Sequence, residues 1–238
     1  MSDWPQTSRP YPGILITLEG GEGSGKSVQA ERLEERLRAH LGGSRQIISI
    51  HEPGGTVLGE GIRHLLKQQP QRLWRRVYKQ WADLTARGPL DPVAELLLFA
   101  AARAQLVSEV VRPYLERGDV VVSDRFADST AAYQGYGRGL DLDIIARTNA
   151  IACQGMKPQL TILLDVPVEV GLARKGPESK RDRLDSEERS FHQKVREGYL
   201  TIAAQEPERW LVLDGRGSPD DIAEAVWRRV RCLFKELR

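Results

Sequence analysis

Cysteine is scarce in this chain, and neither sign of charge dominates. Cys153 and Cys232 are the only cysteines among 238 residues, which is too few for a disulfide framework, and they do not form a metal-ligand spacing such as C-x-x-C. The 35 basic and 33 acidic residues leave a formal charge of +2, so no global field favours DNA, RNA or an acidic membrane. We expect a protein of a reducing compartment that has no nucleic-acid partner.

Long hydrophobic runs are also missing. The first twelve residues are polar and rich in proline, and they lack the apolar core of a signal peptide. No apolar run reaches the roughly 20 residues that a membrane-spanning helix needs. We therefore expect a cytoplasmic protein without a membrane segment, in which residues 1–12 form a disordered or poorly ordered arm before a single domain over residues 13–238.

What the chain does contain is a phosphate-binding loop. Gly20, Gly21, Glu22, Gly23, Ser24, Gly25, Lys26 and Ser27 fit the pattern G-x-x-x-x-G-K-[ST] at every fixed position. The glycines let successive N–H groups converge on phosphate oxygens, Lys26 adds a positive charge, and Ser27 supplies a hydroxyl suited to Mg²⁺. A buried-strand pattern at 14–18 and a helical pattern at 27–41 flank the loop, as the motif requires. The loop therefore predicts binding of a nucleoside triphosphate.

Apolar runs that alternate with helical patterns predict the fold. Further strand-like runs occupy residues 46–50, 120–123, 160–164 and 210–213, and the patterns between them include a long helix over 93–117. Such alternation indicates right-handed crossovers and a parallel sheet with helices on both faces. We predict an α/β protein with a three-layer αβα P-loop fold and a five-stranded sheet. Its ligands are expected at the carboxyl ends of the strands.

A phosphate loop alone is compatible with motors, switches, transporters and kinases, so other residues must decide. Charged groups for a second anionic substrate follow strand ends or lie on nearby helices, namely Glu52, Arg63, Arg103, Asp124 and Arg125. Residues 174–183 read RKGPESKRDR, a basic segment that fits a lid over about 174–185, although a solvated charged loop is the alternative. Because phosphoryl transfer needs positioned cations and exclusion of water, these features favour a small kinase.

Residues 71–88 are an unusual insertion. Leu73, Trp74, Val77, Tyr78, Trp81 and Leu84 line one helical face opposite four basic side chains. An extra helix packed on its own core, or a contact with a partner subunit, explains this pattern better than nucleic-acid binding.

Several motifs together resemble bacterial thymidylate kinases. They are the loop at 20–27, EPGGT at 52–56, LLFAAARAQ at 97–105, DRF at 124–126, STAAYQG at 129–135, GRG at 137–139 and DR at 182–183. The resemblance extends from Gly13 to the C-terminal helical pattern. It implies transfer of the γ-phosphate of ATP to dTMP, with Mg²⁺, for dTTP synthesis by a homodimer.

The resemblance also implies roles on the donor side. The loop would hold ATP, with Lys26 as a catalytic residue, while Ser27 and Asp124 would serve Mg²⁺. In this family the catalytic cation lies either inside the phosphate loop or in the lid. Positions 21–24 carry no basic residue, so the resemblance assigns the cation to the lid, with candidates Arg174, Arg181 and Arg183.

On the acceptor side the resemblance implies a dTMP site. Phe99 would stack on thymine, Arg103 would bond to a base carbonyl, and Arg125 with Arg63 would hold the 5′-phosphate, as their ring and guanidinium chemistry allows. The remaining expected dTMP-binding residues are Glu22 at the 3′-hydroxyl, Glu52, Thr130 and Gln134 near the base edge, and Tyr133 against the sugar.

Two other readings stay open. A kinase for a deoxynucleoside or for another nucleoside monophosphate would share the loop, Asp124 and the lid, but Arg125 and the Phe99–Arg103 pair favour a thymine monophosphate. A non-catalytic ATP-binding regulator is disfavoured by the intact Lys26 and Asp124. The chain departs from the family pattern at His51, where an arginine is usual, and in the length of the 71–88 segment.

Overall fold

The computed structural model describes residues 11–67, 90–175 and 183–236. Most of the predicted arm, the 71–88 insertion and Arg181 lie outside these residues. The elements in chain order are β1 (Ile14–Glu19), α1 (Lys26–Leu41), β2 (Ile47–His51), α2 (Val57–Lys67), α5 (Pro92–Leu106), η1 (Val107–Val111), α6 (Arg112–Glu116), β3 (Val120–Asp124), α7 (Ala127–Thr130), η2 (Ala131–Gly137), α8 (Leu142–Cys153), β4 (Leu160–Asp165), α9 (Val168–Lys175), α10 (Arg189–Gln205), β5 (Trp210–Asp214) and α11 (Pro219–Glu236).

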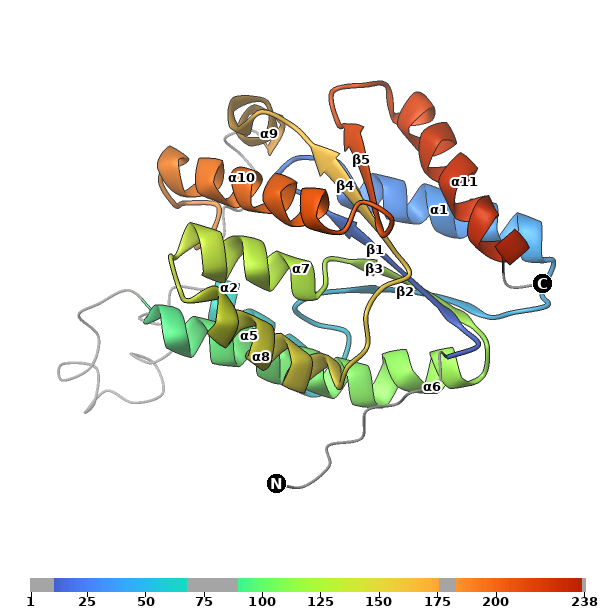
Figure 1. Ribbon diagram of the computed structural model, residues 1–238, viewed down its shortest axis with the longest axis horizontal. Coiled ribbons are helices and arrows are strands. Elements are labelled where there is room, and N and C mark those ends of the chain that lie inside the picture. The colour runs from blue at the N-terminus through green and yellow to red at the C-terminus, as the bar shows by residue number, and fades with distance from the viewer. Residues whose placement is uncertain (1–10, 68–89, 176–182, 237–238) are drawn as a thin grey trace.

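The five strands form one parallel sheet in the order β2-β3-β1-β4-β5. Helices α1 and α11 lie on one side of the sheet, and α5, α8 and α10 lie on the other (Figure 1). The predicted three-layer fold is therefore confirmed.

The central strand β1 explains why both faces are covered. Ile14, Ile16 and Leu18 pack in a core with α1 and α11, whereas Leu15 packs in a second core with α5, η1 and α6. Successive side chains of a strand point to opposite faces, and every residue of β1 is buried, so the strand needs cover on both sides.

The predicted helix over 93–117 is present but irregular. Asp91 caps its start, because its carboxylate accepts hydrogen bonds from the N–H groups of Val93 (2.9 Å) and Ala94 (3.1 Å). The π-helical turn η1 then interrupts the α-helix just before Pro113, a residue that cannot donate a helical hydrogen bond. A second π-helical segment, η2, follows α7 and carries Tyr133 and Gln134.

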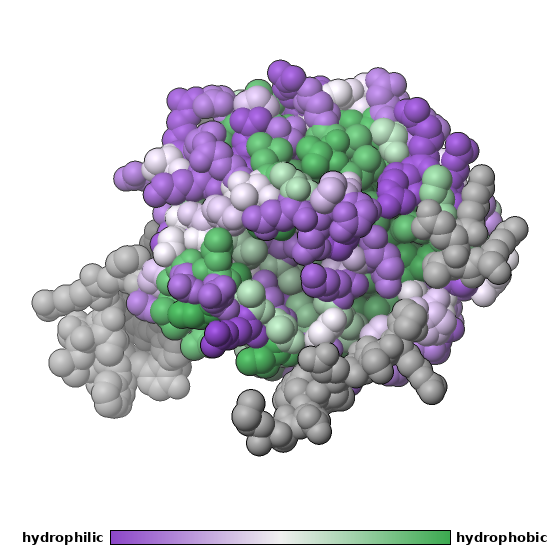
Figure 2. Space-filling view, viewed as in Figure 1, coloured by the Kyte–Doolittle hydropathy of each residue, from purple (hydrophilic) through white to green (hydrophobic). Residues whose placement is uncertain are grey.

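The surface mixes polar and apolar side chains. Figure 2 shows hydrophilic residues over most of one face, with apolar side chains exposed among them near α5 and α8. In the described part of the chain, no helix combines the length and apolarity that crossing a bilayer requires.

Candidate active site

Three sequence motifs meet at one edge of the sheet. β3 lies between β1 and β2, and Asp124 at its carboxyl end is in register with Leu18 of β1 and His51 of β2. The loops that follow these strands therefore open into one cavity of about 450 Å³. Its lining includes the predicted residues Glu22, Gly23, Ser24, Gly25, Lys26, Ser27, Glu52, Arg63, Phe99, Arg103, Asp124, Arg125, Thr130, Tyr133, Gln134 and Arg174.

The phosphate loop packs backbone to backbone against α9. A Cβ atom built on Gly23 would lie 2.0 Å from the carbonyl oxygen of Gly171, and one built on Gly171 would lie 2.2 Å from that of Glu22. Gly23 also has a φ of 65°, in the left-handed region that glycine adopts readily. Both glycines are thus required by the close approach of two backbones, which ties the loop to α9.

Lys26 is buried beneath the loop. Its Nζ donates hydrogen bonds to the carbonyl oxygens of Gly20 (3.2 Å) and Gly21 (2.9 Å) and to Ser24 Oγ (3.3 Å). Burial, followed by repulsion from Arg125, lowers the pKa of Lys26 to about 8. The lysine still lies beside the N–H groups that would receive phosphate oxygens.

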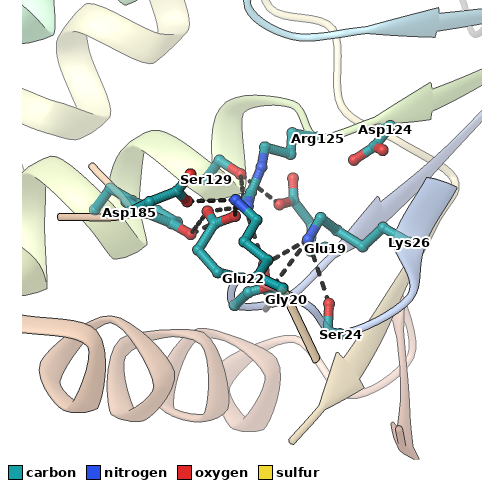
Figure 3. Close-up of polar contacts among 12 residues, drawn as sticks. Glu19, Gly20, Glu22, Ser24, Lys26, Asp124, Arg125, Ser129 and Asp185 are labelled. Carbon is teal, nitrogen blue, oxygen red and sulfur yellow. Dashed lines mark hydrogen bonds and ion pairs between the residues drawn. The ribbon is translucent and has the colours of Figure 1, made fainter. Parts of the chain in front are cut away.

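An ion pair between Arg125 and Glu22 joins the phosphate loop to the opposite wall of the cavity (Figure 3). The Arg125 guanidinium lies 2.9 Å from Glu22 Oε1, and Tyr133 donates to the same oxygen at 2.9 Å. Burial lowers the pKa of Arg125, but Tyr133, Tyr199 and Glu22 outweigh it and the pKa is raised well above its ordinary value. The backbone of Arg125 has a φ of 75°, a conformation that is uncommon for a residue with a side chain.

Lys175 completes this cluster and was missed by the sequence analysis. Its Nζ lies 2.8 Å from Glu22 Oε2 and also contacts Asp185. Burial raises the pKa of Glu22, but Arg125, Lys26 and Lys175 together hold it well below its ordinary value. In the sequence, the position of Lys175 next to Arg174, at the start of the basic segment, was the feature that could have identified it.

Glu19 anchors the turn that carries Arg125, and it too was missed. Its buried carboxylate accepts hydrogen bonds from Phe126 N (2.8 Å), Ser129 Oγ (2.6 Å) and Tyr199 OH (2.9 Å). Burial, aided by Asp128, raises the pKa of Glu19 to about 7. In the sequence, Glu19 could have been identified as a carboxylate at the end of a buried strand, directly before the phosphate loop.

Arg103 and Glu52 form a buried ion pair in the wall of the cavity. Arg103 Nε and one terminal nitrogen lie 2.8 Å and 2.6 Å from Glu52 Oε2. The remaining N–H groups donate to Thr130 Oγ1 (2.9 Å), Asn149 Oδ1 (3.0 Å) and Phe126 O (3.1 Å). The guanidinium therefore ties the loop after β2 to α7 and α8, while Phe99 lies one helical turn earlier and lines the same cavity.

Ser27 and Asp124 bring a hydroxyl and a carboxylate together beside the phosphate loop. Ser27 Oγ donates to Asp124 Oδ2 at 2.7 Å. A hydroxyl and a carboxylate are hard oxygen ligands, and Mg²⁺ is typically held by one or two such groups together with substrate phosphates and water. The donor set present thus fits Mg²⁺.

The arginines predicted to contact phosphate groups lie in different places. Arg63 donates to the carbonyl oxygen of Pro53 (2.7 Å) at the cavity wall. Arg174 lines the cavity and donates to Gly215 O (2.8 Å). Arg183 contacts Glu95 and donates to Leu66 O (3.3 Å), and it is not among the cavity residues of the described chain.

His51, the expected departure from the motif, contacts α2. Its Nε2 lies 3.1 Å from Glu60 Oε1 on α2, and Glu60 also accepts from Gly55 N at 2.9 Å. The histidine thus contacts the carboxylate that holds the loop at 52–56.

Comparison with known proteins decides the family. A family model for thymidylate kinase matches residues 18–79 and 76–226. The chain belongs to the thymidylate kinase family. It is 46% identical to a curated thymidylate kinase from Synechococcus sp. (strain JA-2-3B'a(2-13)) over 214 residues, which is 90% of this chain and 92% of that protein. It is 42% identical to the thymidylate kinase of Deinococcus radiodurans, over 92% of this chain and 96% of the relative.

A solved thymidylate kinase structure agrees with this assignment. The crystal structure from Ehrlichia chaffeensis matches with a TM-score of 0.68 and 30% sequence identity, over 92% of this chain and 98% of that one. The resemblance found in the sequence motifs is confirmed.

Proposed function

We propose that this protein transfers the γ-phosphate of ATP to dTMP, giving ADP and dTDP for dTTP synthesis. The observation that carries the proposal is the joining of two subsites in one cavity. Glu22 of the phosphate loop is bonded to Arg125 and Tyr133 of the opposite wall, so a donor phosphate on the loop and an acceptor phosphate on Arg125 are neighbours. Membership of the thymidylate kinase family supports dTMP as the acceptor.

On the donor side, residues 20–27 hold the ATP phosphates through their N–H groups, and Lys26 adds positive charge. Mg²⁺ binds the Ser27 hydroxyl, with Asp124 at its coordination or water shell. When bound, the metal neutralises charge on the donor phosphates. The hydrogen bond between these two side chains supports their acting at one ion.

On the acceptor side, the ring of Phe99 stacks on thymine, with Arg103 and Thr130 at one base edge and Gln134 at another. Arg125, helped by Arg63, binds the 5′-phosphate. Glu22 and Tyr133 contact the deoxyribose, where the buried Tyr133 leaves little room for a 2′-hydroxyl. Glu52 positions Arg103 through their ion pair. The shared cavity lining of these residues supports this arrangement.

The lid supplies the catalytic cation. Arg174 lines the cavity, which favours it over Arg183, whose guanidinium contacts Glu95; Arg181 lies outside the described residues. Lys175 is a further candidate because it lines the cavity and contacts Glu22. Such a charge stabilises the transferring phosphoryl group.

The protein acts in the cytoplasm as a homodimer. Apolar side chains are exposed on three helices of one region, at Val57 and Leu58 of α2, Leu97 of α5, and Ile144 and Ile151 of α8. α2 packs against α5, and α5 packs against α8, so exposed apolar side chains on these neighbouring helices support a subunit contact.

A coupled assay of ADP release tests the function. With ATP and Mg²⁺, the acceptors dTMP, dUMP, thymidine, CMP and AMP are compared. The proposal expects the highest kcat/KM with dTMP. Preference for thymidine, or no turnover with any acceptor, would refute it.

A further inference from the structure

Glu95 is a buried carboxylate that lies behind the cavity rather than in its lining. It sits in the first turn of α5, and its side chain is 0% exposed. It accepts hydrogen bonds from Gln134 Nε2 (2.7 Å), from Arg138 Nε (3.3 Å) and the Arg138 terminal nitrogen (3.2 Å), and from Arg183. One acidic side chain thus joins α5, the end of η2 and Arg183 of the predicted lid segment.

Its partners keep Glu95 ionised. Burial raises the pKa of this carboxyl, but Arg138, Gln134 and Arg183 together lower the pKa below its ordinary value. An ionised carboxylate only accepts hydrogen bonds. Gln134 must therefore turn its NH₂ group toward Glu95.

The orientation of the Gln134 amide follows from this contact. With Nε2 donating to Glu95, the amide cannot turn over, and its carbonyl Oε1 lies on the other branch of the side chain. Gln134 is buried but lines the cavity together with Phe99, Arg103 and Thr130. With the amide fixed in this orientation, its carbonyl Oε1 is an acceptor that a ligand in the cavity can use.

We propose that Glu95 is a positioning residue that sets base specificity by fixing the Gln134 amide. This inference rests on the proposed dTMP-binding site. Thymine and uracil carry N3–H, a donor that matches the Gln134 carbonyl. Cytosine carries a lone pair at N3, which would face that carbonyl and leave both groups unpaired. A site built to accept a hydrogen bond rejects strongly the analogue that lacks the donor.

Replacement of Glu95 by glutamine tests the proposal. A glutamine at this position can donate as well as accept, so the Gln134 amide becomes free to turn. We expect the ratio of kcat/KM for dTMP over dCMP to fall by about ten-fold or more, since one buried unpaired polar group has roughly that effect on discrimination. Glu95→Asp, which keeps an acceptor, should hold the ratio closer to that of the wild type.

Arg138→Met is the matched control. It removes another partner of Glu95 and leaves the contact with Gln134 in place. A general loss of packing would lower kcat/KM for both nucleotides together, so this variant should leave the ratio unchanged. An unchanged dTMP/dCMP ratio in Glu95→Gln would overturn the inference, as would equal changes of the ratio in Glu95→Gln and Arg138→Met.

Gln134→Leu is a second test that leaves the ion pairs of Glu95 intact. Gln134→Leu should lower the dTMP/dCMP ratio of kcat/KM as Glu95→Gln does. Adding Glu95→Gln to Gln134→Leu should change this ratio no further, because Glu95 acts through Gln134. Undiminished discrimination in Gln134→Leu contradicts the inference even where Glu95→Gln fails to fold. A wild-type protein that does not phosphorylate dTMP would instead refute the proposed function, so the two failures are distinct.

Discussion

Replacement of Arg103 by methionine removes the positive half of a buried ion pair. The Arg103 side chain is 1% exposed and that of Glu52 is 4% exposed, and the guanidinium makes every one of its hydrogen bonds inside the protein. Glu52 Oε1 already has no hydrogen-bond partner within the described chain. Removing one partner of such a pair leaves an uncompensated buried charge, so we expect a loss of about 3–5 kcal/mol in the free energy of unfolding.

The loss should grow with pH. Burial raises the pKa of Glu52, and Arg103 opposes that rise. Without Arg103 the pKa rises further, so the folded state retains a proton that the unfolded state releases. Stability is then greatest below the ordinary pKa of the carboxyl and falls as the pH passes through the raised value. The Arg103→Met variant should lose more stability at alkaline pH than at a pH near the ordinary pKa of a carboxyl group.

Urea unfolding at one fixed protein concentration measures this prediction. The wild type, Arg103→Met, Glu52→Gln and the double variant form a cycle that isolates the pair. We expect the double variant to be more stable than Arg103→Met alone, because the charge of Glu52 is gone. Additive losses that do not depend on pH would refute the reasoning.

Three further predictions concern the loop, the lid and the anchor. Gly171→Ala places a Cβ against Glu22 O, so it should lower the free energy of unfolding by roughly 1–3 kcal/mol and raise KM for ATP more than KM for dTMP. Equal rises in the two KM values would contradict an effect on the phosphate loop. Arg174→Ala or Lys175→Ala should lower kcat by orders of magnitude with a modest change in KM, whereas unchanged kcat in both would move the catalytic charge elsewhere. Wild-type stability should fall as the pH rises through about 7, where buried Glu19 ionises, and Glu19→Gln should lack that step in unfolding curves from pH 5.5 to 8.5.

The sequence predicted those parts of the site that lie within one short motif. The phosphate loop fixes its own conformation through consecutive residues, and Asp124 and Arg125 directly follow an apolar strand. The sheet was predictable because each strand contains a short apolar run and each crossover is long enough for a helix. Strand pairing at one edge then brought the motifs together.

Contacts between distant residues were not predictable from local pattern. Tyr199 reaches Glu19 across 180 positions in the chain, and neither residue belongs to a motif that names the other. Lys175 was overlooked because only arginines were considered as catalytic cations of the lid. Arg183 was expected at the phosphates, but it contacts Glu95. Side-chain pairing of this kind depends on the three-dimensional arrangement of α5, α9 and α10, which the sequence pattern does not contain.

Transfer of labelled γ-phosphate tests the central claim most directly. ATP labelled at the γ-phosphate is incubated with Mg²⁺ and dTMP, with the wild type and with Arg125→Met, and the labelled products are separated. We predict that the label appears in dTDP with the wild type and that Arg125→Met lowers this rate by orders of magnitude. Label found in inorganic phosphate alone, or in a phosphorylated nucleoside when thymidine is supplied in place of dTMP, would contradict it.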